Sequence, residues 1–133
     1  MSVSVEVVDA WLAEFGRVWR EADVPGAVAV MTEDGSYRNS PFLEQPYVGH
    51  RAIAGFWEAA LEGVSDVDFR YGVPVIDGDR VGVEWWATLR SNGEPFTLAG
   101  NFLLTFEGDR VADLRESFVK QAGALEPHEG WGL

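Results

Sequence analysis

Three polar residues, Tyr37, Asn39 and Glu116, have the side chains best suited to chemistry in this 133-residue chain. Tyr37 and Asn39 are two positions apart, so on an extended strand they project from the same face. Glu116 interrupts the apolar face of the last predicted strand. A phenol, a carboxamide and a buried carboxyl can together orient a water molecule or an oxygenated ligand. These three are therefore the candidate catalytic residues.

Each of these residues has a second interpretation. In an apolar cavity the pKa of Glu116 would rise, and the carboxyl could act as a general acid or base. Alternatively, Glu116 pairs with Arg38 or Arg70 at the sheet edge. Tyr37 could hydrogen-bond a ligand or merely cap the core. Asn39, which precedes Ser-Pro, is also a common turn residue.

The elements that position these residues begin with helices. Apolar residues over 8–22 recur at three- and four-residue steps, which predicts an amphipathic helix. A short helix is predicted over 24–31, capped by Asp23, and a third over 50–62. Residues 32–35 read as a turn before a short strand that carries Tyr37 and Asn39. The proline-containing segment 40–49 reads as a loop.

From residue 66 onward the hydrophobic period changes to two. Strands are predicted over 66–73, 81–90, 96–106 and 111–119, with glycine-containing turns at 77–79, 91–94 and 107–109 between them. Three helices followed by long antiparallel strands favour an α+β fold. The segment after residue 120 is expected to be irregular, with Trp131 folding back.

Composition narrows the function classes. We expect one domain over residues 1–133. The chain has no cysteine, which excludes disulfides and thiolate chemistry, and only two histidines. We expect neither a metal nor another cofactor. The net charge of −12 opposes nucleic acid and anionic membranes as partners. The sequence shows neither an apolar run of roughly 20 residues nor a signal peptide, so we expect a cytoplasmic protein.

Several segments, in order, resemble the SnoaL-like proteins of the nuclear transport factor 2-like superfamily. They include VAVMTEDGSYRN, YVGHRAIAGFW, DRVGVEWWATLR and FEGDRVADLRESF, within a resemblance over about residues 5–120. The resemblance implies a cone: a curved, mostly antiparallel sheet wrapped around a long N-terminal helix, with two further helices and an internal cavity. The superfamily includes limonene-epoxide hydrolase, ketosteroid isomerase, scytalone dehydratase, polyketide cyclases and non-enzymatic binding proteins. Fold therefore does not fix function.

The epoxide hydrolase can be compared residue by residue. Its Tyr-x-Asn segment resembles Tyr37 and Asn39, and its water-activating carboxylate resembles Glu116. Its remaining pair, an arginine and an aspartate, falls on Trp85 and Ala87 here. Neither of these can exchange a proton with an epoxide oxygen, so epoxide hydrolysis is not predicted.

Strand parity predicts the walls of the cavity. If Glu116 faces inward, the inner face also carries Trp85 and Phe102, and small residues at the centre leave room for a ligand. Core packing is the alternative for the aromatic residues. The predicted ligand-binding residues are Trp11, Phe15, Tyr47, Trp57, Tyr71, Trp85, Gly100 and Phe102.

The predicted function is that of a small-molecule pocket protein. It could be an enzyme that uses Glu116 for proton transfer on an apolar oxygenated ligand, in an isomerisation, dehydration, cyclisation or addition of water. The alternatives are a non-catalytic binding protein and a dimeric scaffold. Trp86 should project from the outer face of the sheet with Leu103, which predicts a homodimer. Alternatively, Trp86 lies under the C-terminal tail, against Trp131.

Overall fold

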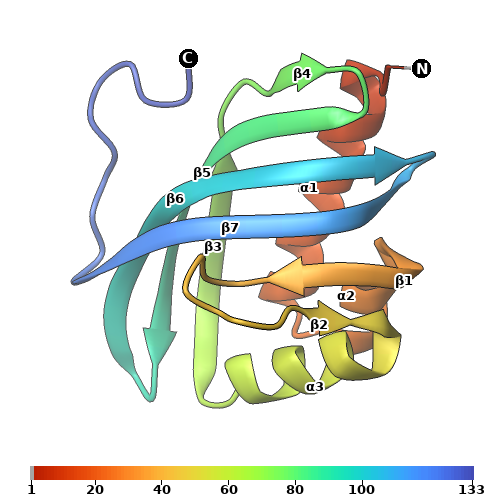
Figure 1. Cartoon of the computed structure of the whole chain (residues 1–133). Helices are drawn as coiled ribbons and strands as arrows, with labels where there is room; N and C mark the ends of the chain where they lie inside the picture. The colour runs from red at the N-terminus through yellow and green to blue at the C-terminus, as the bar shows by residue number, and fades with distance from the viewer. Residues whose placement is uncertain (1) are drawn as a thin grey trace.

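A curved sheet wraps around the long N-terminal helix in the computed structural model, which describes residues 2–133 (Figure 1). The strand order is β2-β1-β7-β6-β5-β3, with β4 added beside β5. All neighbours are antiparallel except β1 and β7, which are parallel. The predicted α+β cone is confirmed. The elements are α1 (Val5–Arg20), α2 (Val24–Ala29), β1 (Met31–Arg38), β2 (Tyr47–Val48), α3 (Gly49–Ala60), β3 (Val64–Tyr71), β4 (Val75–Asp77), β5 (Arg80–Ser91), β6 (Glu94–Glu107) and β7 (Arg110–Ala122).

Helix α1 supplies the central apolar face. Ser4 caps it by accepting a hydrogen bond from the backbone N–H of Val7. Gly16 lets the helix approach β3, because a Cβ there would lie 3.0 Å from the ring of Phe69. No helix within residues 2–133 is long and apolar enough to cross a membrane. The buried face of α1 consists of Val8, Trp11, Leu12, Phe15, Gly16 and Val18.

The long strands alternate as predicted. On β5, Val83, Trp85, Ala87 and Leu89 are buried, while the residues between them are exposed or half-buried. Two residues that are directly paired on neighbouring antiparallel strands project from the same face of the sheet. Trp85 pairs with Gly100, which in turn pairs with Phe118. The inner faces of β5, β6 and β7 are therefore continuous.

The predicted turn over 32–35 is wrong. These residues lie within β1, and the pairing of β1 with β7 shifts register between Met31 and Ser36. The irregularity absorbs extra residues, so Glu33 and Asp34 stay exposed within a strand. Two short strands, β2 and β4, were not predicted, because two or three residues are too few to show an alternation of apolar and polar side chains.

The C-terminal segment, residues 123–133, crosses part of the outer face of the sheet, at the left of Figure 1. The Thr97 hydroxyl donates to the Gly123 carbonyl (2.8 Å) and accepts from the Leu125 N–H (2.9 Å). Trp86 Nε1 donates to the Leu125 carbonyl (2.9 Å), and its ring lies 5.9 Å from that of Trp131. The expectation of a solvent-exposed Trp86 is thus wrong. The alternative, a tryptophan under the tail, is what the structure shows.

Candidate functional site

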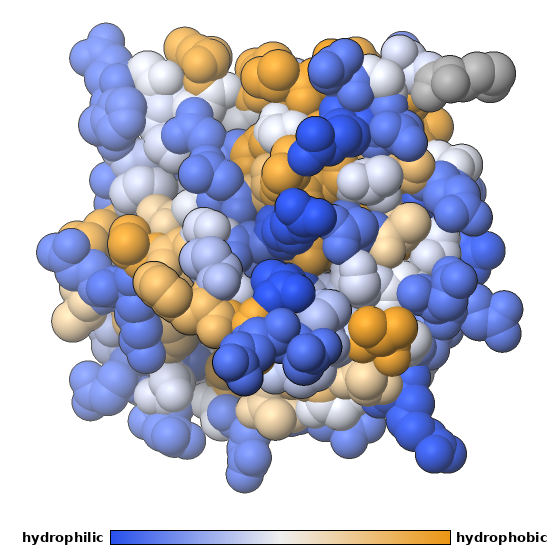
Figure 2. Space-filling view, viewed as in Figure 1, coloured by the Kyte–Doolittle hydropathy of each residue, from blue (hydrophilic) through white to orange (hydrophobic). Residues whose placement is uncertain are grey.

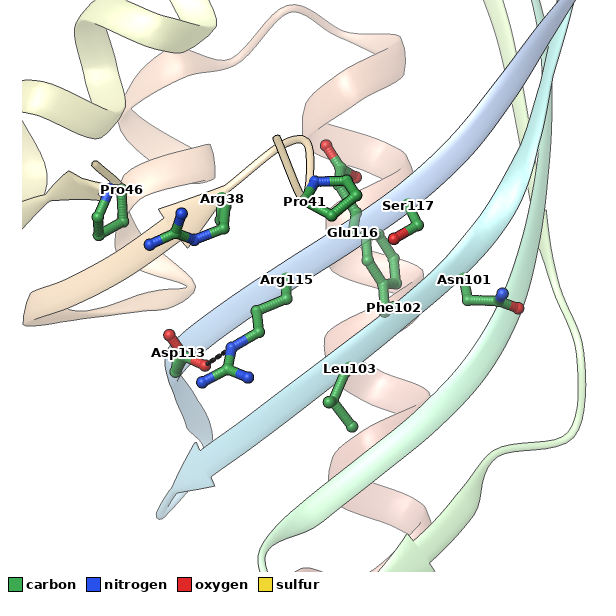
Figure 3. A pocket seen from close by; sticks show the side chains of 10 residues that line it. All are labelled: Arg38, Pro41, Pro46, Asn101, Phe102, Leu103, Asp113, Arg115, Glu116 and Ser117. Carbon is green, nitrogen blue, oxygen red and sulfur yellow. Dashed lines mark hydrogen bonds and ion pairs between the residues drawn. The ribbon is translucent and has the colours of Figure 1, made fainter. Parts of the chain in front are cut away.

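Glu116 and Tyr37 meet inside the cone. The parallel pairing of β1 and β7 sets Tyr37 beside Leu114, and the Tyr37 hydroxyl donates to Glu116 Oε1 at 3.3 Å. Both residues are buried, with 9% of Glu116 and 2% of Tyr37 exposed. Figure 3 shows Glu116 turned behind the sheet toward α1, whereas Arg115 lies on the near, outer side. Glu116 therefore belongs to the interior.

The alternative of an ion pair at the sheet edge does not hold. Arg38 donates to the backbone carbonyl of Leu43, and Arg70 pairs with Glu126. Within residues 2–133, Glu116 makes no ion pair. Its hydrogen-bond partner there is the Tyr37 hydroxyl.

Burial without a cation changes the acidity of both groups. Desolvation raises the pKa of the Glu116 carboxyl from 4.5 to about 8, opposed by the hydrogen bond from Tyr37, which lowers it. Desolvation, together with the neighbouring carboxyl, raises the pKa of the Tyr37 hydroxyl well above its usual range. At neutral pH, Glu116 is thus mostly a neutral acid that can both donate and accept a hydrogen bond.

The two groups line a cavity of about 180 Å³ between the sheet, α1 and α3. Its walls are otherwise aromatic or aliphatic, apart from the half-buried Asn39 where β1 ends. The lining residues are Phe15, Trp19, Tyr37, Asn39, Phe56, Trp57, Ala60, Val64, Trp85, Leu89, Phe96, Leu98, Glu116 and Phe118.

The structure therefore brings six of the predicted site residues together. The three candidate catalytic residues share the cavity with Phe15, Trp57 and Trp85. The ring of Phe15 lies 5.6 Å from that of Trp57, and Trp57 lies 6.2 Å from Tyr37. Helices α1 and α3 and strands β1, β5 and β7 each contribute to the wall.

Four predicted aromatic residues, Trp11, Tyr47, Tyr71 and Phe102, lie outside this lining. Trp11 is core, with Nε1 donating to the Val30 carbonyl at 2.9 Å. The Tyr71 hydroxyl reaches the backbone of α1. The ring of Phe102 lies 5.1 Å from that of Phe15, and Phe102 faces the same side of the sheet as Glu116 in Figure 3.

Tyr47 and Gly100 also differ from the expectation. The Tyr47 ring packs at a tilt against the lining residue Phe56, with the two ring centroids 5.1 Å apart. Gly100 is not needed for ligand space. A Cβ at Gly100 would lie 2.0 Å from the Ser117 carbonyl oxygen, so the glycine permits close approach of β6 and β7 instead.

Several wall residues were absent from the predicted site, among them Trp19, Phe56 and Phe96. Trp19 belongs to the period of α1, and Phe56 to that of α3, so both read as core in the sequence. Phe96 lies near the start of β6, close to a turn, where the alternation of side chains alone does not indicate a cavity. Within residues 2–133, no three His, Cys, Asp or Glu side chains gather as a metal site would require.

Comparison with known proteins agrees with this fold. The SnoaL-like domain family matches residues 8–114, and the chain belongs to that family. No curated protein matches the sequence significantly. Among solved structures, a nuclear transport factor 2-like protein from Burkholderia xenovorans is 24% identical, with a TM-score of 0.64 over 87% of this chain and 92% of the other.

Two further solved structures share the fold. A hypothetical protein from Catenulispora acidiphila, with a ketosteroid isomerase-like fold and in complex with trimethylamine, has a TM-score of 0.70 at 20% identity, covering 86% of each chain. A Mycobacterium tuberculosis epoxide hydrolase resembling limonene-epoxide hydrolase has a TM-score of 0.68 at 17% identity, over 86% of this chain and 81% of the other. At these identities the likeness shows the fold alone.

Proposed function

We propose that this SnoaL-like protein binds one small, apolar, oxygenated molecule in the cavity and transfers a proton through Glu116. The observation that carries the proposal is a buried carboxyl, hydrogen-bonded at 3.3 Å to the Tyr37 hydroxyl, in the wall of an otherwise apolar cavity. An ionisable group is costly to bury without a cation. Perturbed carboxyls in clefts of this kind are candidates for acid–base chemistry.

The size of the cavity bounds the ligand. An apolar cavity of about 150 Å³ can hold benzene, so about 180 Å³ has room for one six-membered ring with a small substituent. Trp85, which lines the cavity, has a buried indole N–H without a hydrogen-bond partner. A ligand oxygen that reached this N–H would satisfy it. Size and polarity together favour a cyclic ketone, enone or alcohol as the part of the ligand that enters the cavity.

The roles of the residues follow from their chemistry. Below a pH of about 8, Glu116 is protonated and can give its proton to a ligand oxygen; above it, the carboxylate can take a proton from carbon or water. Tyr37 donates a hydrogen bond that steadies the carboxylate or the ligand oxygen. Asn39, at the end of β1, can orient the ligand or a water molecule. Isomerisation, dehydration, cyclisation and water addition all require such a transfer.

A non-catalytic binding protein is the second candidate. Trp85 and Ala87 occupy the positions where the resemblance to limonene-epoxide hydrolase would require an arginine and an aspartate. Within the described residues 2–133, the cavity lining therefore holds no arginine–aspartate pair beside Glu116. This favours simple chemistry with one carboxyl, or binding alone.

We also propose that two copies of the chain associate through the outer face of the sheet.

The test measures proton transfer without assuming a natural substrate. Cyclohexanone, as a probe of cavity size, is incubated with the protein in D₂O, and exchange of its α-protons is followed by NMR. We expect the wild type to accelerate exchange, Glu116→Gln to return it to the background, and Tyr37→Phe to weaken it. Glu58→Gln, which removes an exposed carboxyl from α3, is the matched control and should behave as the wild type.

The outcomes separate the candidates. Binding of the ketone, seen as a change in tryptophan fluorescence because Trp19, Trp57 and Trp85 line the cavity, without faster exchange would favour the binding protein. Faster exchange that persists in Glu116→Gln would place the chemistry elsewhere.

A further inference from the structure

Lys120 is the chain's single lysine, and it lies on the same strand and the same face as Glu116. On β7, residues two apart share a face, so Glu116, Phe118 and Lys120 form one row. Lys120 pairs directly with Leu98 of β6 in the antiparallel register, and Leu98 lines the cavity. The row therefore runs from the buried carboxyl, past an aromatic wall residue, to an exposed cation.

The ammonium group sits over the rim of the cavity. Lys120 Nζ lies 4.2 Å from the centroid of the Phe96 ring, and Phe96 is itself a lining residue. Within residues 2–133, no carboxylate forms an ion pair with Lys120, whereas Arg17, Arg70, Arg90 and Arg115 are all paired. Phe118, next to Lys120 in this row, is 39% exposed although it lines the cavity, so the cavity opens on the side where the unpaired ammonium group lies.

We infer that the ligand carries one anionic group, a carboxylate or its equivalent, which Lys120 binds at the mouth while the apolar head of the ligand lies beside Glu116. This inference rests on the proposed function of the cavity and names its substrate class. Four residues along a strand span about 13 Å. The ligand is therefore a ring with a chain of several methylene groups that ends in the anion.

The charges around the mouth of the cavity are compatible with a ligand that carries one negative charge. Glu116 is the one acidic residue in the lining, and at neutral pH it is mostly protonated. The remaining negative charge of the chain lies on the surface, where physiological salt screens it over about 8 Å. A ligand with several negative charges would still be repelled by a protein of net charge −12.

Two probes of equal length test the inference: 6-phenylhexanoate and its neutral amide. Their dissociation constants are measured by quenching of the cavity tryptophans, at low and at high salt. We expect the wild type to bind the acid about threefold more tightly than the amide, as suits an exposed charge pair. The preference should shrink as salt is added.

Variants at Lys120 assign the preference to its charge. Lys120→Met keeps an apolar chain over Phe96 and should abolish the preference for the acid, with binding of the amide unchanged. Lys120→Arg should retain the preference. Arg110→Met makes the same change in net charge at the opposite end of β7 and should bind both probes as the wild type does.

The outcomes separate this inference from the proposed function. If the amide binds and the acid binds no better in the wild type, or if Lys120→Met weakens both probes equally, the inference is overturned and the cavity remains a binding site. If neither probe binds, both this inference and the proposed function fail.

Discussion

At the scale of single residues, burial of the Glu116 carboxyl lowers the free energy of unfolding. The carboxyl is buried beside the Tyr37 hydroxyl and has no cation to pair with. Such a group is stable mainly in its neutral form. The chain nevertheless places a glutamate where strand parity calls for an apolar residue. Such a conflict between local pattern and global fold is expected where a side chain serves function rather than stability.

The cost predicts how stability depends on pH. Because burial raises the pKa of Glu116 from 4.5 to about 8, the folded state binds the proton more tightly than the unfolded state. The stabilisation is complete below pH 4.5 and is lost as pH rises toward 8. Between pH 5 and 8, the wild type should lose on the order of 3 kcal/mol of unfolding free energy relative to Glu116→Gln.

Urea denaturation of the two proteins across this range measures the difference. The comparison cancels the half-buried surface carboxyls Glu14 and Asp23. Hydrogen bonds lower their pKa values, and they titrate equally in both proteins. Parallel stability curves for wild type and Glu116→Gln would mean that the carboxyl is not buried in solution.

At the scale of elements, the bend shared by β6 and β7 shapes the cone. At Gly100 the two strands approach so closely that a Cβ would lie 2.0 Å from the Ser117 carbonyl oxygen. The obstacle is backbone rather than the end of a flexible side chain, so β7 itself would have to move. Phe118 and Glu116 lie on that part of β7 and line the cavity.

Gly100→Ala should therefore destabilise the protein by about 1–3 kcal/mol and weaken ligand binding through the displaced strand. Gly82→Ala is the matched control on the neighbouring strand β5, because a Cβ there meets no atom within 4 Å. That change should be neutral or slightly stabilising, since alanine loses less backbone entropy on folding. Urea midpoints compare the two, and an equal effect would show that the approach of the strands at Gly100 imposes no constraint.

Gly100 also illustrates what the sequence could predict. The alternation of side chains between the two faces of a strand correctly predicted that Trp85 and Glu116 point inward. This alternation is regular in long strands such as β5 and β7. It could not tell whether Gly100 leaves ligand space or permits strand contact, since both look the same in a sequence. The bulge in β1 was missed for a related reason: exposed Glu33 and Asp34 read as a turn.

At the scale of the whole molecule, the C-terminal segment divides the outer face of the sheet. It covers Trp86 and Thr97 on β5 and β6. The part over β1, β7 and the neighbouring stretch of β6 stays open and forms a groove of about 530 Å³, which Figure 3 shows with Arg38, Leu103 and Arg115 among its residues. Figure 2 shows this side of the molecule as mixed apolar and charged surface.

The proposed homodimer should use this open part rather than Trp86. Leu103 is 37% exposed in the groove, flanked by two arginines in a chain of net charge −12. The groove holds as many arginines as acidic residues, with Arg38 and Arg115 against Asp113 and Glu116, so two acidic copies repel each other less there than across faces that carry the net negative charge. Because the remaining repulsion is screened by salt, raising salt should tighten the dimer.

Light scattering over a concentration series tests the interface with two matched variants. Leu103→Glu places two buried charges near the centre of the contact and should weaken association at least tenfold, because unpaired charges are costly to desolvate. Val75→Glu makes the same change in charge on β4, where Val75 is 73% exposed and outside the groove, and should leave association nearly unchanged. A wild type that stays monomeric at every concentration would refute the dimer. Equal weakening by both variants would mean that charge alone, and not this face, controls association.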